Sequence, residues 1–272
     1  MSASREQGKG SLYARLGLGQ DNLYAIAGRS VISLVALLIV WELVAQFLIK
    51  NRLVLAPPTA VLEALITDGF NGDLLKNSFA TLTEIFVSFP VAVLIGVAIG
   101  VALSASRELG QIAEPLLTAL YSVPMIALAP LFIASLGLGL ASKFAIILAV
   151  SVFPIIITTE VGLSSTDKIF LDAARSFNAT RLQIFTTVQF PFALPYIISG
   201  LRVAFARALV GAVVGEFFGA FAGYGFAILA ASQNFNTARL LGYVVLLAVL
   251  GMIGSITLRW VERKMSPWRE TG

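Results

Sequence analysis

Ionisable side chains inside long apolar stretches are the residues of this sequence that could do chemistry. They are Glu42, Glu84, Glu160, Arg202, Arg207 and Glu216. Charges at membrane depth are costly, and they usually mark solute pathways, proton relays or buried ion pairs. Glu216 is too far along one helix from Arg207 for a direct pair at the i+4 spacing. We therefore expect the partner of Glu216 on another helix or in a water-filled pathway.

Most enzymatic chemistry is excluded by composition, because the 272 residues include no Cys and no His. Without thiols and imidazoles there are no disulfides, no typical zinc or haem sites and no Ser–His or Cys–His nucleophile. The segment Gly8-Lys9-Gly10 lacks the upstream glycine of a phosphate-binding loop, so any ATP hydrolysis must occur on another chain. We predict no catalytic residue, no metal site and no cofactor.

The overall composition is that of an integral membrane protein. Apolar residues make up 58% of the chain and charged residues 12%, against about 45–50% and about 25% in soluble domains. The net charge of +4 fits basic residues that orient membrane helices, so we expect a lipid environment and no nucleic acid.

Apolar stretches of about the length that a helix needs to cross a bilayer predict six transmembrane helices. They cover residues 32–49, 79–104, 112–136, 144–160, 196–221 and 240–258. Pro and Gly inside them are tolerated because neighbouring helices satisfy the freed backbone groups. The expected fold is all-α, with an N-terminal tail at 1–28, a transmembrane domain at 29–260 and a C-terminal tail at 261–272.

Orientation follows from the distribution of Lys and Arg. One side of the predicted spans holds Arg5, Lys9, Arg15, Arg29, Arg107, Lys168, Arg175, Arg181, Arg259, Arg263, Lys264 and Arg269. The other side holds only Lys50, Arg52, Lys76, Lys143 and Arg239. Because positive residues concentrate in cytoplasmic segments, both termini and the segment 162–195 are predicted to be cytoplasmic.

A short helix is expected outside the first span. Residues 55–59 contain two prolines and favour an extended turn, after which Thr59 is predicted to cap a helix that ends near Asp68. Its apolar side suggests a helix lying along the membrane interface. A ligand-binding loop is the alternative.

The polar segment 162–195 contains the signals of two helices. Ser165 or Thr166 is expected to cap the first, with Asp167 in its first turn, where the helix dipole favours negative charge. Asn178 tolerates the left-handed conformation that ends a helix. Thr180 then opens the second helix in a capping box with a Gln side chain.

Pro191 and Pro195 are expected to interrupt the second helix on its way back into the membrane. An ordinary connection between bundle helices has about 2 to 8 residues. This segment is several times longer and is organised as helix, turn, helix. We therefore interpret it as a surface presented to a partner.

The same segment resembles the EAA motif in the permease subunits of binding-protein-dependent ABC importers. That motif reads Glu-Ala-Ala, three residues, Gly, about nine residues and an Ile/Leu-Pro ending. Here Asp172-Ala173-Ala174 is followed by Arg175-Ser176-Phe177 and Asn178, and Leu194-Pro195 ends the segment. Asp replaces Glu and still places an acid early in the helix. Asn replaces Gly and still tolerates a positive φ. Further stretches are similar to permeases for nitrate, sulfonate, taurine and related small organic solutes.

The resemblance implies a function without catalysis, in the bacterial plasma membrane. A coupling helix would contact a cytoplasmic ATPase through Asp172, Ala173, Ala174, Arg175, Phe177 and Asn178. Two ATPases, a second permease copy and an extracytoplasmic solute-binding protein would complete the importer. We expect a homodimer of permeases, with a heterodimer as the alternative.

Other interpretations of the chain are a secondary transporter or channel and, with less support, an intramembrane enzyme. A secondary transporter or channel would have no use for the two-helix segment. An intramembrane enzyme would need catalytic groups, but the chain has no His, no Cys and no paired Asp residues within the spans. Glu216 and Arg202 are assigned a pathway or a structural role, the latter near the cytoplasmic interface.

Overall fold

The computed structural model describes residues 22–266, which are mostly helical and include no strand. The chain forms two compact units, Met1–Glu63 and Ala64–Gly272. Most of the predicted N-terminal tail lies outside the described residues. Its last residues belong to helix α2, Asn22–Leu43, which continues as a π-helical segment, Val44–Ile49.

Helix α3, Pro58–Phe70, begins two residues before the start expected from a cap at Thr59. Thr59 does not cap it. Instead, the Thr59 backbone N–H and Oγ1 donate to the Glu42 carboxylate of α2, at 3.1 and 2.9 Å. A carboxylate suits the free N–H groups at a helix N-terminus, and Pro58 fits the first helical position because it has no N–H to satisfy.

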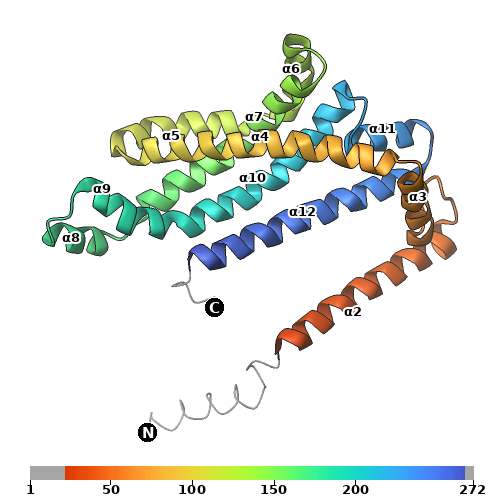
Figure 1. The fold of residues 1–272 in the computed structure, drawn as a ribbon, viewed down its shortest axis with the longest axis horizontal. Helices are drawn as coiled ribbons and strands as arrows, with labels where there is room; N and C mark the ends of the chain where they lie inside the picture. Colours follow the sequence, from red (N-terminus) through yellow and green to blue (C-terminus); the bar gives the residue numbers. More distant parts are fainter. Residues whose placement is uncertain (1–21, 267–272) are drawn as a thin grey trace, which may run out of the picture. The chain divides into compact units, whose positions relative to one another are not determined.

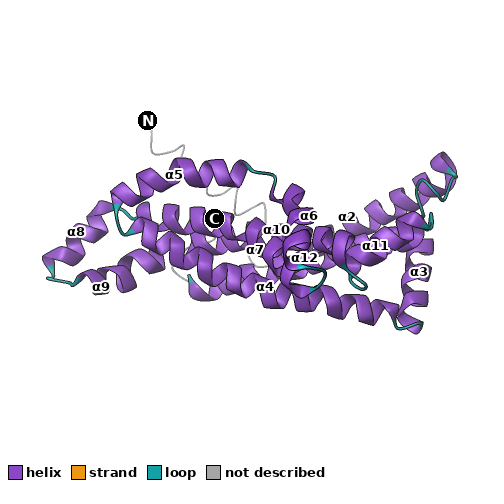
Figure 2. Ribbon diagram, turned by 90° about the horizontal axis from the view of Figure 1, so that it is seen from above, coloured by secondary structure: helices purple, strands orange, loops and turns teal. Residues whose placement is uncertain are grey.

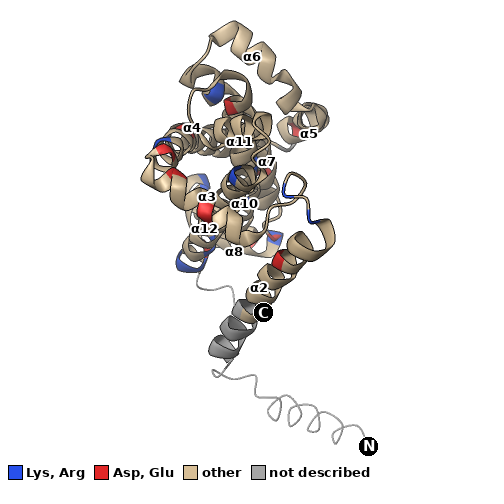
Figure 3. Ribbon diagram, turned by 90° about the vertical axis from the view of Figure 1, so that its right-hand side faces the viewer, with Lys and Arg blue, Asp and Glu red and all other residues tan. Residues whose placement is uncertain are grey.

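The second unit is a bundle around helix α7, Leu140–Ser164, which packs most extensively against α10, Phe190–Gly219, and α4, Asp73–Ser104. Helices α11, Tyr224–Gln233, and α12, Thr237–Met265, complete it. Figures 1 and 2 show α8, Lys168–Ser176, and α9, Arg181–Ile184, at one end of this unit and α11 at the other. Figure 3 views the helices from the end that carries α11, with most residues neither acidic nor basic.

Five helical segments of the described residues are long and apolar enough to cross a membrane. They are Ile32–Ile49, Asp73–Ser104, Leu140–Ser164, Arg181–Gly219 and Thr237–Met265. The first agrees with the predicted boundaries. The others extend beyond the apolar stretches, because flanking polar residues continue the same helices.

The predicted third span, 112–136, is not one straight helix. It consists of α5, Arg107–Ser122, a 3₁₀ turn, Met125–Leu128, and α6, Ala129–Leu136, with a bend of 67°. Val123 is extended there, with φ −66° and ψ 129°. Pro124 explains this conformation, because its ring disfavours the helical conformation of the preceding residue.

The predicted interruption at Pro191 and Pro195 is wrong. Helix α9 continues through a π-helical segment, Phe185–Gln189, directly into α10. Pro191 stands in the first turn of α10, and Pro195 lies inside it. The wider π-helical turn accommodates the proline ring that would clash with a carbonyl in a regular helix.

Small residues let the central helices approach closely. A Cβ atom added to Gly96 would lie 2.7 Å from Ile155 Cβ, and one added to Gly100 would lie 2.6 Å from Thr159 Cβ. This glycine pair therefore lets α4 pack closely against α7 within the subunit. The packed core positions the polar residues considered next.

Candidate functional site

The connection between α7 and α10 begins with two hydroxyl residues that close α7. Ser165 Oγ and Thr166 Oγ1 each donate to a carbonyl of the last turn of α7, at 3.1 Å. Asp167 caps α8, and its Oδ1 accepts a hydrogen bond from Ile169 N at 3.0 Å. The prediction that Ser165 or Thr166 caps this helix is wrong, because both hydroxyls are already bonded to α7 while the Asp167 carboxylate faces the free N–H groups.

Large apolar side chains of helix α8 and of its C-terminal cap, Phe177, are exposed. Ile169 is 72% exposed, Phe170 55% and Phe177 87%, and no residue of α8 is buried. The helix therefore adds little to the core of the bundle. Large apolar side chains gathered on an exposed, otherwise polar helix are typical of a protein interaction surface.

The residues that resemble the EAA motif lie on the same helix. Ala173 is exposed and Ala174 is half-buried. Arg175 Nη1 and Asp172 Oδ1 form an ion pair at 2.9 Å, with both side chains exposed. An exposed pair of this kind contributes little stability, so both charges remain free to exchange this contact for another.

Asn178 ends α8 in the conformation expected from sequence, with φ 52°. Its N–H donates to Arg175 O at 2.9 Å, and Ala179 N donates to Ala174 O at 3.2 Å. These two bonds form a Schellman motif, which satisfies carbonyls that the helix end leaves free. The turn between α8 and α9 therefore has a defined geometry.

Helix α9 begins with the predicted capping box. Gln183 N donates to Thr180 Oγ1 at 3.3 Å, and Thr180 N donates to Gln183 Oε1 at 2.8 Å. Ile184 is buried, and Arg175 and Arg181 line a cavity of about 660 Å³ between the connection and the end of α4. The connection is thus held against the bundle while α8 presents its outer side.

Glu216 of α10 is buried and hydrogen-bonded across helices, as the sequence required. Thr81 Oγ1 of α4 donates to its Oε1 at 2.6 Å, and Gly225 N of α11 donates to its Oε2 at 2.5 Å. Thr81 Oγ1 in turn accepts from Tyr224 N at 2.8 Å. This network fixes the turn between α10 and α11 onto α4.

A second buried carboxylate, Glu84, lies nearby, and its buried partner Lys143 was missed in the sequence. Lys143 of α7 donates to Glu84 Oε1 of α4, and the two residues are 7% and 3% exposed. Glu84 Oε2 has no hydrogen-bond partner. Sequence reasoning placed Lys143 in a loop outside the membrane because it stands beside a polar turn, whereas α7 begins earlier, at Leu140.

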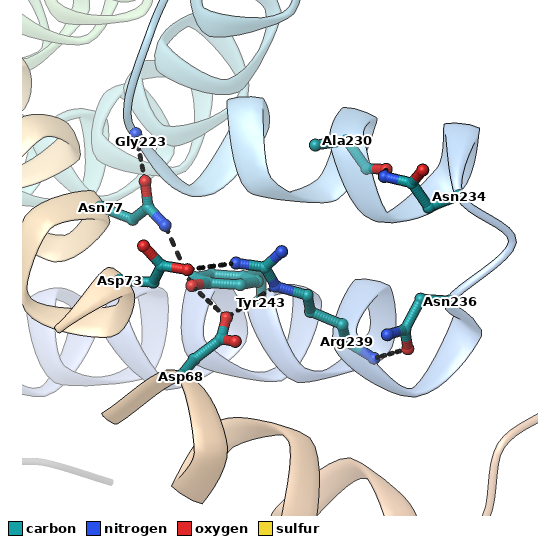
Figure 4. Close-up of polar contacts among 9 residues, drawn as sticks. All are labelled: Asp68, Asp73, Asn77, Gly223, Ala230, Asn234, Asn236, Arg239 and Tyr243. Carbon is teal, nitrogen blue, oxygen red and sulfur yellow. Dashed lines mark hydrogen bonds and ion pairs between the residues drawn. The ribbon is translucent and has the colours of Figure 1, made fainter. Parts of the chain in front are cut away.

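Acids from α3 and α4 meet a base of α12 at the end of the unit opposite α8. Arg239 Nε donates to Asp68 Oδ2 at 2.8 Å, and Arg239 Nη2 donates to Asp73 Oδ2 at 3.0 Å. Figure 4 shows the guanidinium reaching both carboxylates. Arg239 is remote in sequence from both aspartates, so no local pattern could have predicted this cluster.

Tyr243 extends the same network into the core. Its hydroxyl donates to Asp68 Oδ2 at 2.7 Å and accepts from Asn77 Nδ2 at 3.0 Å. Asn77 Oδ1 accepts from Gly223 N at 3.0 Å, as Figure 4 also shows. The network therefore joins α3, α4, α12 and the residue before α11.

The two arginines of α10 differ in their partners. Arg202 Nη2 lies 3.4 Å from Glu262 Oε2 of α12, with both side chains partly exposed. Arg207 Nη2 instead donates to the neutral Tyr121 hydroxyl of α5 at 3.1 Å. Arg202 is therefore neutralised within the described bundle, whereas Arg207 keeps its charge.

Comparison with known proteins identifies the chain's relatives. Residues 92–267 match a family described as binding-protein-dependent transport system inner membrane component. The chain is 31% identical to the taurine transport system permease protein TauC of Escherichia coli, over 88% of this chain and 89% of that protein. It is 28% identical to the nitrate import permease protein NrtB of a Synechocystis species, over 86% of each chain.

Solved structures agree on the fold. In one inward-facing structure of the MetNI methionine ABC transporter, a chain covered over 95% of its length superposes on 71% of this chain. The TM-score is 0.63 at 22% identity. A second crystal form gives a TM-score of 0.65 at 21% identity, over 98% of that chain and 73% of this one.

Proposed function

The chain belongs to the family of binding-protein-dependent transport system inner membrane components, and we propose that its α8–α9 connection is the surface through which an ATPase drives transport. The protein is a multi-pass permease subunit of an ABC importer in the plasma membrane. It is a transport component that works with ATPase subunits, and we assign ATP hydrolysis entirely to those partner chains.

The exposed apolar side of α8 is the observation that supports this assignment most directly. Ile169, Phe170 and Phe177 leave large apolar areas in water, and burying each of them in a cleft of the ATPase is worth about 1.5–3 kcal/mol. The caps at Asp167 and Asn178 hold the helix in shape before contact. A preorganised helix loses less entropy on binding.

The residues that resemble the EAA motif have separate roles in this contact. Ala173 and Ala174 permit a close approach because their side chains are small. Asp172 and Arg175 exchange their mutual ion pair for charge-assisted bonds with the ATPase. Asn178 shapes the turn that sets the angle between α8 and α9.

Force applied at α8 reaches the membrane domain through one helical segment. Arg181–Gly219 runs without interruption from the connection to the buried network around Glu216. Because α10 packs along α7, a shift of α8 tilts or translates the centre of the bundle. Such a movement would switch the permease between inward-open and outward-open states.

We assign six spans to the chain, counting the bent α5–α6 pair as one, with both termini in the cytoplasm. The Lys and Arg distribution supports this orientation. Figure 1 also shows the C-terminal end of α12, which carries Arg259, Arg263 and Lys264, directed toward the side of the unit that carries α8 and α9. Residues 1–28 and 261–272 are then the two cytoplasmic tails.

One permease chain is half of a translocation pathway. We assign the complete importer two copies of this chain, two ATPases and an extracytoplasmic binding protein that delivers the solute. The names of TauC and NrtB support a nitrate-, sulfonate- or taurine-like solute. Glu216 and Arg202, each held by partners on other helices, have structural roles in this assignment.

Substitutions on α8 test the proposal. The double variant Ala173→Arg, Ala174→Arg should abolish co-purification with the ATPase in mild detergent while leaving the permease in the membrane. Gln233→Arg, exposed at the end of α11 on the opposite end of the unit, is the matched control and should retain the ATPase. Undiminished ATPase binding and uptake by the double variant would disprove the coupling assignment.

A further inference from the structure

Arg207 is a charged residue in the middle of the apolar stretch 196–221, and its side chain is exposed. Its Nη2 donates to the Tyr121 hydroxyl at 3.1 Å, and its Cζ lies 5.3 Å from the centre of the Tyr121 ring. Neither contact neutralises the guanidinium. A cation at this depth is costly unless water or an anion reaches it.

Three other bases in or beside the spans meet carboxylates. Lys143 pairs with Glu84, Arg202 with Glu262 and Arg239 with two aspartates. Within residues 22–266, no acidic side chain forms an ion pair with Arg207. Carboxylates therefore neutralise several cations of the described bundle, but none of them neutralises Arg207.

Arg207 lines two cavities that are large enough for small solutes. One has a volume of about 410 Å³ and is bordered by Tyr121, Met125 and Phe153. The other, of about 580 Å³, is an open depression of the surface bordered by Ser199, Val203 and Ser255. Arg202 also lines it, but this base is paired with Glu262. No acidic residue lines either cavity. Volumes in this range are typical of small-molecule sites.

The wall of the first cavity contains irregular backbone. Val123 and Pro124, at the 67° bend between α5 and α6, border it. Backbone that leaves the helical pattern at membrane depth is tolerated where it is buried in protein or lines water. Val123 and Ile126 at the bend are partly exposed, so this irregular backbone and the uncompensated charge of Arg207 both fit a place that water reaches.

We propose that Arg207 binds the anionic group of the transported solute at a water-accessible site on the exposed face of the bundle, midway along the apolar stretch 196–221. The proposal rests on the proposed function, because it places this site on the solute's path. The ligand class is a small oxyanion, such as a sulfonate, a carboxylate or nitrate, whose oxygens match the planar fork of a guanidinium. While the Tyr121 oxygen accepts from Arg207, its own hydrogen is free to bond a second oxygen of the anion.

The absence of Cys from the chain permits a direct test. Val210 lines both cavities and stands one helical turn after Arg207. Purified permease–ATPase complex carrying Val210→Cys would be labelled with methanethiosulfonates bearing either a sulfonate or a trimethylammonium group. The rates are normalised to those with a free thiol and with the uncharged methyl reagent, which measures accessibility alone.

We expect the sulfonate reagent to be preferred over the cationic one by about tenfold or more, as a nearby charge in a medium of intermediate dielectric constant implies. Added Arg207→Gln should remove the preference, and Arg207→Lys should keep most of it. Taurine, nitrate and acetate, added separately as competitors, should slow labelling by the sulfonate reagent and rank the three anion classes.

Equal normalised rates for the two charged reagents would overturn the site, and so would a preference for the sulfonate reagent that survives Arg207→Gln. The site would also be overturned if the cysteine reacted only after the protein had been denatured. The ATPase content of each sample separates this proposal from the coupling assignment. The Arg207→Gln variant should retain the ATPase. A loss of the charge preference while the ATPase stays bound therefore reports on the site at Arg207 and not on the coupling surface of α8.

Discussion

Lys143 of α7 donates a hydrogen bond to Glu84 of α4 inside the bundle, where both side chains are buried. Desolvation offsets most of the attraction in such a pair, but removing one partner leaves a buried charge uncompensated. We expect Lys143→Met to cost about 3–5 kcal/mol of stability. The double variant Lys143→Met, Glu84→Gln should recover a large part, as thermal unfolding in one detergent would measure. A double variant no more stable than the single one would contradict a dominant charge effect.

Thr81 should contribute more to stability than another buried hydroxyl of the same helix. Thr81 Oγ1 accepts from Tyr224 N and donates to Glu216, whereas Ser88 Oγ is buried without a hydrogen-bond partner. We expect Thr81→Val, which keeps the shape, to cost about 1–3 kcal/mol because two buried groups lose their partner. Ser88→Ala should be neutral or slightly stabilising. Equal effects in thermal unfolding would show that the network around Glu216 does not stabilise the turn.

Arg239 should hold the acids of α3 and α4 at the end of the unit opposite α8. Because its side chain is 27% exposed, solvent screens part of the loss, and we expect Arg239→Met to cost about 1–3 kcal/mol. Asp68 is nearly buried and should account for most of this cost, so adding Asp68→Asn should restore more stability than adding Asp73→Asn. The thermal midpoints of the three variants measure this order, and the reverse order would contradict it.

The parts of the fold that could be predicted from sequence depend on local rules. The first span follows from one continuous apolar stretch, and the left-handed Asn178 and the capping box of Thr180 and Gln183 follow from residues within one or two helical turns. The capping of α8 was mispredicted because three adjacent residues could all accept the same hydrogen bonds. Which one does so depends on how α7 ends.

Interactions between distant residues could not be predicted. Lys143 and Glu84 are far apart in sequence, and Arg239 meets Asp68 only because α3 packs on α12. The effect of a proline on a span could not be predicted from the residue alone either. Pro124 breaks a span, while Pro191 is absorbed by a π-helical turn. The outcome depends on whether neighbouring turns can widen, and this is decided by packing rather than by the residue itself.

Asn178 tests whether the shape of the α8–α9 turn matters for coupling. A β-branched residue at φ 52° is strained by about 1–2 kcal/mol, whereas Gly is not. We therefore expect Asn178→Val to lower ATPase co-purification and uptake several-fold, and Asn178→Gly to behave like the wild type.

A second left-handed residue in the chain provides the control for this experiment. Phe235, with φ 54°, lies between α11 and α12, at the end of the unit away from α8. Phe235→Val places a β-branched residue in the same backbone region and removes the ring, so it should lower thermal stability while leaving ATPase binding intact. If both variants lost the ATPase equally, general destabilisation would explain the effect. If Asn178→Val retained it fully, the geometry of the turn would not be required for the contact. A loss confined to Asn178→Val is the result expected of a rigid turn that aims α8 at its partner.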